Sequence, residues 1–210
     1  MILIGQYDSP FVRRVAIALR LYGMAYEHRP WSVFGDAEAL AQFNPLRRVP
    51  TLVLDDGTAL MESGAILDWL DEQAGPDLAL IAPSGLQRRD ALRICALASG
   101  LADKAVSLVY ERVVHDRATP MWVERCRAQV GGVLDTLETA RDVRTRWWFG
   151  ERLNHADIIV GCVLRFLREA HPDVFDAARW PALAAHAEAC EALADFQAVA
   201  QPFHVAPPKG

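Results

Sequence analysis

The chain has 210 residues, of which 52% are hydrophobic and 23% charged, enough for one large domain or two small ones. Its formal net charge is −5, and its basic residues are scattered, so the electrostatic footprint of a nucleic-acid-binding protein is missing. No apolar run approaches the ~20 residues of a membrane helix, and residues 1–25 lack the pattern of a secretory signal, so we expect no membrane partner.

The first 43 residues combine strand and helix patterns. An apolar run at residues 2–4 predicts a buried strand. Apolar residues that recur at helical spacing from Val12 to Tyr22 predict a helix, and Gly23 is placed to end it. Residues 26–33 contain a second predicted strand, and residues 36–43 a short helix with Asp36 as its N-cap.

A loop, a hairpin and a helix follow. The loop runs from Asn44 to Pro50, and the residue before Pro50 cannot be helical. The segments 51–54 and 58–61 flank an Asp-Gly pair, which is a hairpin signal. A helix is expected over residues 63–74. The predicted order is therefore strand, helix, strand, helix, strand, strand, helix, which is an α/β arrangement.

Strand patterns are absent after residue 86. Helical patterns cover residues 86–115, 120–143, 155–170 and 181–196, and the proline-rich tail 201–210 is expected to be irregular. We therefore predict an α/β domain over residues 1–77, a linker over 78–85 and an all-helical domain over 86–210. Asn154 and Asp157 have the spacing of a capping box, His155 is expected on the helix surface, and Trp147 and Trp148 are expected in the core.

The cysteines and histidines argue against a metal site. The four cysteines, at positions 95, 126, 162 and 190, form no C-x-x-C pair and stand in apolar helical patterns. Buried thiols of this kind fit a reducing cytoplasm. His115, His186 and His204 have no partner at metal-ligand spacing. We therefore expect no metal.

Ser9 and Pro10 lie at the junction between the first predicted strand and the first predicted helix. A helix start presents N–H groups and the positive end of the helix dipole, which can hold an anion or lower the pKa of a thiol. The alternative is a purely structural role, because Ser is a favoured N-cap and Pro is favoured at the first helical position.

Four motifs in order resemble the glutathione transferase family over essentially the whole chain. They are Ser9-Pro10-Phe11, the segment from Asn44-Pro45 to Val49-Pro50-Thr51-Leu52, Glu62-Ser63, and Asn154-His155-Ala156-Asp157. The resemblance implies a thioredoxin-like (βαβαββα) N-terminal domain, an all-helical bundle domain, a cytoplasmic homodimer and a role in detoxification. It also implies that glutathione is the co-substrate.

The resemblance assigns residues to each part of glutathione. A cis Val49-Pro50 bond would let the backbone of Val49 pair with the cysteinyl part. Ser63 can cap its helix and receive the γ-glutamyl carboxylate there, while Glu62 faces the ammonium group. The glycine carboxylate is assigned to Arg48, with Arg47 as a competing candidate. The glutathione-binding set implied by the family is Ser9, Phe11, Arg48, Val49, Pro50, Glu62 and Ser63.

Ser9 is the candidate catalytic residue, because a hydroxyl that donates to sulfur stabilises the thiolate. Tyr7 is the runner-up, since other members of the family use a phenol near this strand end. The chain lacks the Cys of glutaredoxin relatives, so dithiol redox chemistry is not expected. It retains only the first residue of the Ser-Ser-Cys motif of maleylacetoacetate isomerases, which argues against that isomerisation.

The sequence thus predicts a glutathione S-transferase that activates the thiol for attack on a small hydrophobic electrophile. Glutathione-dependent dehalogenation, peroxide reduction and ether cleavage use the same thiolate and stay open. A non-catalytic binding or scaffold protein with this fold is a further alternative. The second substrate is expected in an apolar cleft between the domains, with Phe11, Phe34, Tyr110 and Trp122 as its candidate lining residues.

Overall fold

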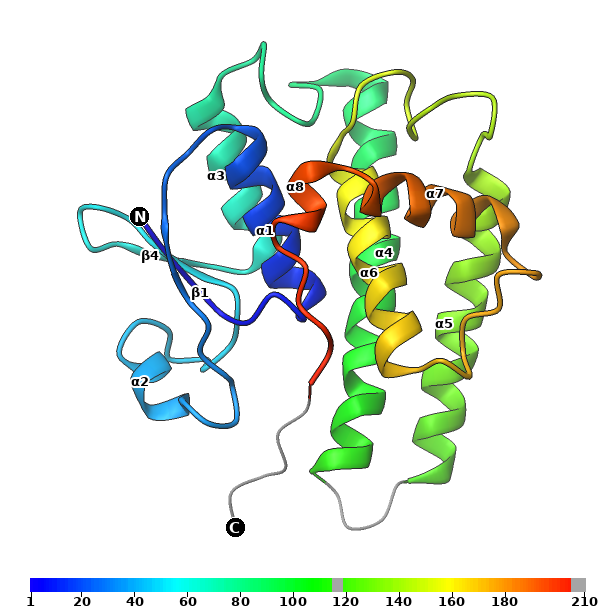
Figure 1. The fold of residues 1–210 in the computed structure, drawn as a ribbon, viewed down its shortest axis with the longest axis horizontal. Coiled ribbons are helices and arrows are strands. Elements are labelled where there is room, and N and C mark those ends of the chain that lie inside the picture. Colours follow the sequence, from blue (N-terminus) through cyan, green and yellow to red (C-terminus); the bar gives the residue numbers. More distant parts are fainter. Residues whose placement is uncertain (115–118, 205–210) are drawn as a thin grey trace. The chain divides into compact units, whose positions relative to one another are not determined.

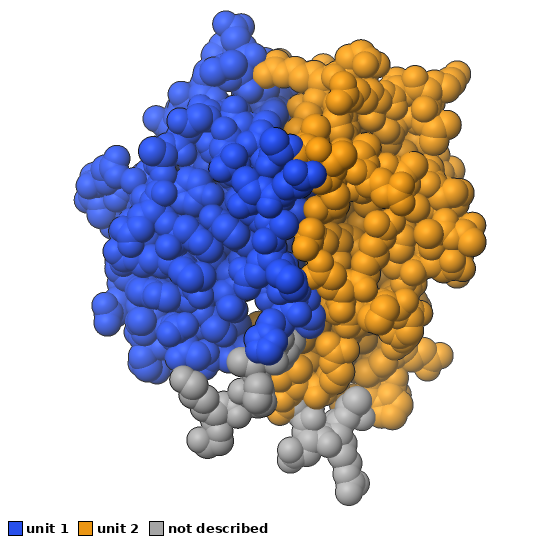
Figure 2. Space-filling model, in the orientation of Figure 1, with its two compact units in different colours: residues 1–83, 194–210 blue, residues 84–193 orange. Residues whose placement is uncertain are grey.

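The computed structural model describes residues 1–114 and 119–204 (Figure 1). Contacts divide the chain into two units, coloured separately in Figure 2: unit 1 is Met1–Pro83 with Ala194–Gly210, and unit 2 is Ser84–Leu193. Among the described residues, no helix is both long and apolar enough to cross a membrane. His115 lies outside the described residues, so the expectation that it binds no metal is not tested.

Unit 1 contains the predicted α/β order. Its elements are β1 (Ile2–Ile4), α1 (Pro10–Leu21), β2 (Glu27–Arg29), α2 (Ala37–Ala41), β3 (Thr51–Val53), β4 (Ala59–Met61), α3 (Ser63–Ala74) and the short C-terminal α8 (Ala194–Gln197). The strands described form one sheet in the order β2-β1-β3-β4. The first pair is parallel and the other two are antiparallel. This confirms the predicted fold class.

Both faces of the inner strands of the sheet, β1 and β3, are largely buried. Ile4 and Val53 cluster with Leu40 of α2, and Trp31 and Phe43 pack against them. Neighbouring strand residues point to opposite faces, so Leu3, which is fully buried, faces away from α2. Helices α1 and α3 pack against each other (Figure 1). Strand β1, one of the two inner strands of the sheet, is therefore covered on both faces. This packing fixes the position of its C-terminal end, from which the chain leads to Ser9.

Local signals predicted most boundaries but not all. Helix α1 ends where expected, with Gly23 at φ 65° just beyond it. The second strand is only three residues long, within the predicted 26–33. The side chain of Asp36 does not cap α2; its Oδ2 instead accepts the N–H of Ser32 at 2.8 Å. The carboxylate therefore accepts a hydrogen bond from the preceding turn and not from the first N–H groups of α2.

Unit 2 is a helical bundle of α4 (Gly85–Val113), α5 (Pro120–Ala140), α6 (His155–Ala170) and α7 (Pro181–Glu191). Helix α6 packs against α4 and α7, and α5 packs against the same two helices (Figure 1). Asn154 and Asp157 form the predicted capping box at the start of α6. Trp147 and Trp148 are buried, as predicted. All four cysteines lie in described residues as buried thiols outside any disulfide.

Two sequence predictions about the helical part are wrong. His155 is buried rather than on the surface, because α6 is the central helix of its unit and the first turn is covered as well. The division also places residues from 194 onward in unit 1, whereas the sequence assigned them to the helical domain 86–210. The reason is a set of contacts to α1: the guanidinium of Arg13 donates to the carbonyls of Phe196 and Val199 at 2.9 and 3.3 Å.

Candidate active site

The turn after β1 is built on a close approach of three segments. Gly5 has φ 130°, a conformation that favours glycine. A Cβ at this position would lie 2.5 Å from Cγ2 of Val12 and 2.8 Å from Cβ of Val49, too close for either neighbour. The absence of a side chain at Gly5 therefore lets the end of β1, the start of α1 and the Val49-Pro50 segment meet.

Ser9 is the N-cap of α1. Its Oγ accepts the backbone N–H of Val12 at 3.4 Å, and Pro10 occupies the first helical position. The cap uses a lone pair of the hydroxyl and leaves its hydrogen. In the part of the chain that the structure describes, that hydrogen has no acceptor. The structural role therefore does not exclude the chemical one, because Ser9 can cap the helix and still donate to a ligand.

The Val49-Pro50 peptide bond is cis, as predicted. The loop before it is organised by Asn44, a buried residue to which sequence reasoning assigned no role of its own. The amide of Asn44 donates to the carbonyl of Arg48 and to Oγ1 of Thr51, each at 3.0 Å, and its Oδ1 accepts from Leu46 at 2.9 Å. Within the described residues the backbone of Val49 forms no hydrogen bond. Its N–H and C=O remain available to an extended ligand.

Helix α3 begins differently from the sequence prediction. Glu62 is the N-cap, with φ 67°, and its side chain makes no capping bond. Ser63 is the first helical residue, so the prediction that Ser63 caps the helix is wrong. The buried hydroxyl of Ser63 instead lies 3.5 Å from Nη1 of Arg14. The N–H groups of residues 63–65 precede the first intrahelical bond, and this helix start is a potential anion site.

The two candidate arginines have different partners. Nη1 of Arg48 lies 3.1 Å from Oε1 of Glu62, and both side chains are more than half exposed. Arg47, at φ 51°, pairs instead with Glu38 at 3.0 Å. Arg48 is therefore the arginine at the start of α3. The sequence analysis did not single out Arg14. It could have been noticed as a charged residue within the apolar pattern of α1.

Tyr7 faces β2. Its hydroxyl lies 2.9 Å from that of Tyr26, and its ring stacks on His28 with centroids 3.8 Å apart. Burial, with the hydrogen bond to Tyr26, raises the pKa of the Tyr7 phenol, which keeps it protonated. Since the Tyr7 side chain faces Tyr26 and His28, whereas the Ser9 hydroxyl lies at the start of α1, we favour Ser9 over Tyr7 for contact with sulfur.

The expected second-substrate residues belong to different units. Phe11, half-buried on α1, and the exposed Phe34 belong to unit 1. Tyr110 on α4 and Trp122 on α5 belong to unit 2, where Nζ of Lys104 lies 5.4 Å from the Trp122 ring centroid. Each is described within its own unit, so the proposed lining of a shared cleft stays a prediction. The described residues contain no group of acidic, His and Cys side chains suited to a metal ion.

Comparison with known proteins identifies the family. Residues 3–77 match the profile described as "Glutathione S-transferase, N-terminal domain", and residues 120–189 match "Glutathione S-transferase, C-terminal domain". The chain belongs to the glutathione S-transferase family. It is 30% identical to the "Uncharacterized GST-like protein YibF" of Escherichia coli, over 80% of this chain and 82% of that protein. It is also 29% identical to the maleylacetoacetate isomerase of Pseudomonas aeruginosa, over 75% and 77% of the two chains.

Solved structures of this family share the fold. The glutathione S-transferase of Methylobacterium radiotolerans, crystallised with glutathione sulfonate, has a TM-score of 0.92 and 29% identity, covering 100% of this chain and 98% of its own. The Methylobacillus flagellatus enzyme with glutathione bound has a TM-score of 0.87 and 29% identity, covering 96% and 99%. A zeta-class maleyl pyruvate isomerase has a TM-score of 0.81 and 26% identity, covering 95% and 96%.

Proposed function

We propose that this glutathione S-transferase binds glutathione in unit 1 and activates its thiol as a thiolate for attack on a small hydrophobic electrophile. The proposal rests on two contacts that bring the predicted glutathione-binding groups together. At Gly5, the start of α1, which carries Ser9, meets Val49. On the same helix, Arg14 lies 3.5 Å from Ser63 at the start of α3. The glutathione complexes of two similar proteins support this choice of ligand.

Each part of glutathione has a complementary group. The γ-glutamyl carboxylate would accept from the N–H groups at the start of α3 and from Ser63, with the Arg14 guanidinium 3.5 Å behind that hydroxyl. The cysteinyl backbone would pair with Val49 in the manner of an added strand. The ammonium would face Glu62 and the glycine carboxylate Arg48. These two side chains form an exposed ion pair, which costs little to open because exposed pairs are weak.

Thiol activation requires a modest free energy. A thiol with a pKa near 8.5 is mostly protonated at neutral pH, and lowering the pKa by about two units takes about 2.7 kcal/mol. A charge-assisted hydrogen bond from Ser9 contributes about 1.5–3 kcal/mol, and the positive end of α1 adds about 0.3–1 kcal/mol. Together these terms are sufficient.

Three variants separate the two roles of Ser9. In Ser9→Ala the cap and the donor are both lost, so we expect the unfolding free energy to fall by about 1 kcal/mol and the pKa of bound glutathione to rise. In Ser9→Asp the carboxylate can still cap the helix but has no proton to donate. We therefore expect the unfolding free energy to recover while the pKa of bound glutathione stays raised. Ser84→Ala is the matched control, because Ser84 is the N-cap of α4 without a side-chain capping bond.

The measurement is the pH dependence of thiolate absorbance in the glutathione complex, together with conjugation of an aromatic halide and urea unfolding. An unchanged thiol pKa in both Ser9 variants would remove Ser9 from the chemistry. Calorimetry with glutathione tests the scaffold alternative, which predicts no heat of binding.

The reaction beyond thiolate formation needs a product assay. Conjugation, dehalogenation, peroxide reduction and ether cleavage all start from the same thiolate, so we would compare an aryl halide, a hydroperoxide and an aryl ether. We propose conjugation as the main activity. A homodimer in the cytoplasm is proposed from family membership, and the buried thiols of the chain fit a reducing compartment.

A further inference from the structure

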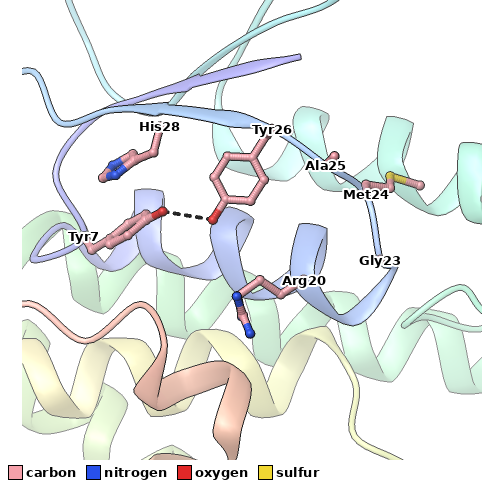
Figure 3. A pocket seen from close by; sticks show the side chains of 7 residues that line it. All are labelled: Tyr7, Arg20, Gly23, Met24, Ala25, Tyr26 and His28. Atoms are coloured by element: carbon pink, nitrogen blue, oxygen red, sulfur yellow. Dashed lines mark hydrogen bonds between the residues drawn. The ribbon is translucent and has the colours of Figure 1, made fainter.

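Unit 1 has a hollow that is lined by none of the residues proposed above to bind glutathione. It has a volume of about 490 Å³ and is lined by Tyr7, Arg20, Gly23, Met24, Ala25, Tyr26 and His28 (Figure 3). These residues come from the turn after β1, the end of α1, the segment that leads into β2 and β2 itself. The aromatic rings and Met24 offer apolar surface beside the positive charge of Arg20, and no lining residue in this set is acidic.

The aromatic side of the hollow is held in a defined geometry. Tyr7 is fixed by its backbone N–H, which donates to Oε1 of Gln201 at 3.0 Å, and by its ring, which stacks on His28 at an interplanar angle of 4°. His28 is fixed in turn, because its Nε2 lies 2.8 Å from the carbonyl of Gly5. A ligand would therefore meet side chains that need little further ordering, which lowers the entropic cost of binding.

The two phenols leave one hydrogen for a ligand. The hydroxyls of Tyr7 and Tyr26 lie 2.9 Å apart and share one hydrogen bond. Each phenol carries one hydrogen, so the phenol that accepts in this bond keeps a hydrogen to donate. Within the described residues that hydrogen has no acceptor. Burial raises the pKa of the Tyr7 phenol, so this phenol stays protonated.

Arg20 supplies the charge. Its Nε donates to Oδ1 of Asp195 at 3.0 Å, and the guanidinium makes no other hydrogen bond in the described part of the chain. The Nη groups therefore retain donors arranged to match a carboxylate or sulfonate. Figure 3 shows this guanidinium on the same side of the hollow as the two phenolic hydroxyls.

We propose that this hollow is a binding site for a flat aromatic anion, separate from the glutathione site. The carboxylate or sulfonate of the ligand binds the Nη groups of Arg20 and the phenolic hydrogen, and its ring lies against the aromatic side chains and Met24. This charge, hydrogen-bonding and apolar pattern distinguishes an aromatic anion from a neutral aromatic molecule of the same size.

Calorimetry with two matched probes tests the proposal: 2-naphthoate, and the neutral 2-naphthalenemethanol. We expect naphthoate to bind at or below about 1 mM and more tightly than the alcohol. Arg20→Gln should weaken naphthoate about tenfold and leave the alcohol unchanged. Asp195→Asn breaks the same ion pair but keeps Arg20, so it should preserve or strengthen naphthoate binding. The double variant Tyr7→Phe/Tyr26→Phe removes both phenolic donors and should weaken naphthoate severalfold, whereas Tyr26→Phe alone leaves the Tyr7 hydrogen to donate and should have a smaller effect.

Two controls show whether naphthoate occupies this hollow or another part of the protein. Arg144→Gln removes an exposed arginine that also pairs with a carboxylate, Asp142, and should leave naphthoate binding unchanged. Saturating glutathione should not displace naphthoate. The proposal is wrong if naphthoate does not bind at millimolar concentration, if it binds no better than the alcohol, if Arg20→Gln has no effect, or if glutathione competes for the site.

Discussion

At the scale of single residues, Gly5 is a position with little tolerance for change. Gly5→Ala would place a methyl group against Cβ of Val49, which cannot swing away as the end of a flexible side chain could. The residue would also keep a backbone conformation that is unfavourable for alanine.

We expect Gly5→Ala to lower the unfolding free energy by roughly 2–4 kcal/mol and to weaken glutathione binding, because Val49 must shift. Gly57→Ala is the matched control: Gly57 also has a positive φ, but a Cβ there meets nothing within 4 Å. Urea unfolding of both variants measures the difference. Equal losses would mean that backbone strain alone, and not the close approach to Val49, accounts for the effect.

At the scale of elements, the contact between α6 and α7 contains two buried groups with opposite dependence on pH. Burial raises the pKa of Asp157 to about 6. Burial, followed by the charge of Arg141, lowers the pKa of His186 to about 4. Nε2 of His186 lies 3.8 Å from Oδ1 of Asp157 and 3.5 Å from the sulfur of Cys190, and Nε of Arg141 donates to its Nδ1 at 3.2 Å.

The two shifts oppose each other in stability. The stability from His186 is complete above its ordinary pKa of 6.5 and is lost as the pH falls toward 4. The stability from Asp157 is complete below its ordinary pKa of 3.8 and is lost as the pH rises through 6. Between these limits the two effects partly cancel.

We therefore expect His186→Gln to unmask the effect of Asp157. Relative to the unchanged protein, the unfolding free energy of this variant should increase, which means greater stability, as the pH is lowered from 7 to 5, because the destabilising protonation of His186 has been removed. Urea unfolding at several pH values measures it. An identical pH dependence in the two proteins would show that His186 does not titrate differently on folding.

At the scale of the whole molecule, the chain returns to its first unit at its end. Arg13 is buried on α1 and donates to carbonyls of the C-terminal segment, while its guanidinium lies 5.5 Å from the ring centroid of Phe196. Exposed contacts follow the same path: Arg20 pairs with Asp195, and the N–H of His204 donates to Asp8 at 3.3 Å.

Removal of residues 194–210 should therefore destabilise unit 1 by about 3 kcal/mol or more, because a buried cation loses acceptors. Removal of residues 205–210 alone is the control, since it keeps every contact described for the segment. Chemical denaturation of the two truncated chains makes the comparison. Arg13→Met in the shorter chain should recover part of the loss, and failure to recover would assign the effect to the apolar contacts of Phe196.

The sequence alone determined the order of the elements, the hairpin at Asp56-Gly57 and the capping box of Asn154 and Asp157. It also predicted the range of α3, which the structure places at Ser63–Ala74. These features depend on neighbours a few residues apart, through side-chain periodicity, turn chemistry and capping. The four family motifs were recognisable for the same reason, since each is a short local pattern.

Only the tertiary structure decided which distant segments meet. It paired Arg48 with Glu62 and Arg47 with Glu38, placed Arg14 behind Ser63, buried His155 and joined the C-terminal segment to α1. No local pattern encodes these results, because a side chain's partner and its burial depend on packing between segments far apart in the chain. The hollow beside Tyr7 and Arg20 has the same origin, in the meeting of a turn, a helix end and a strand.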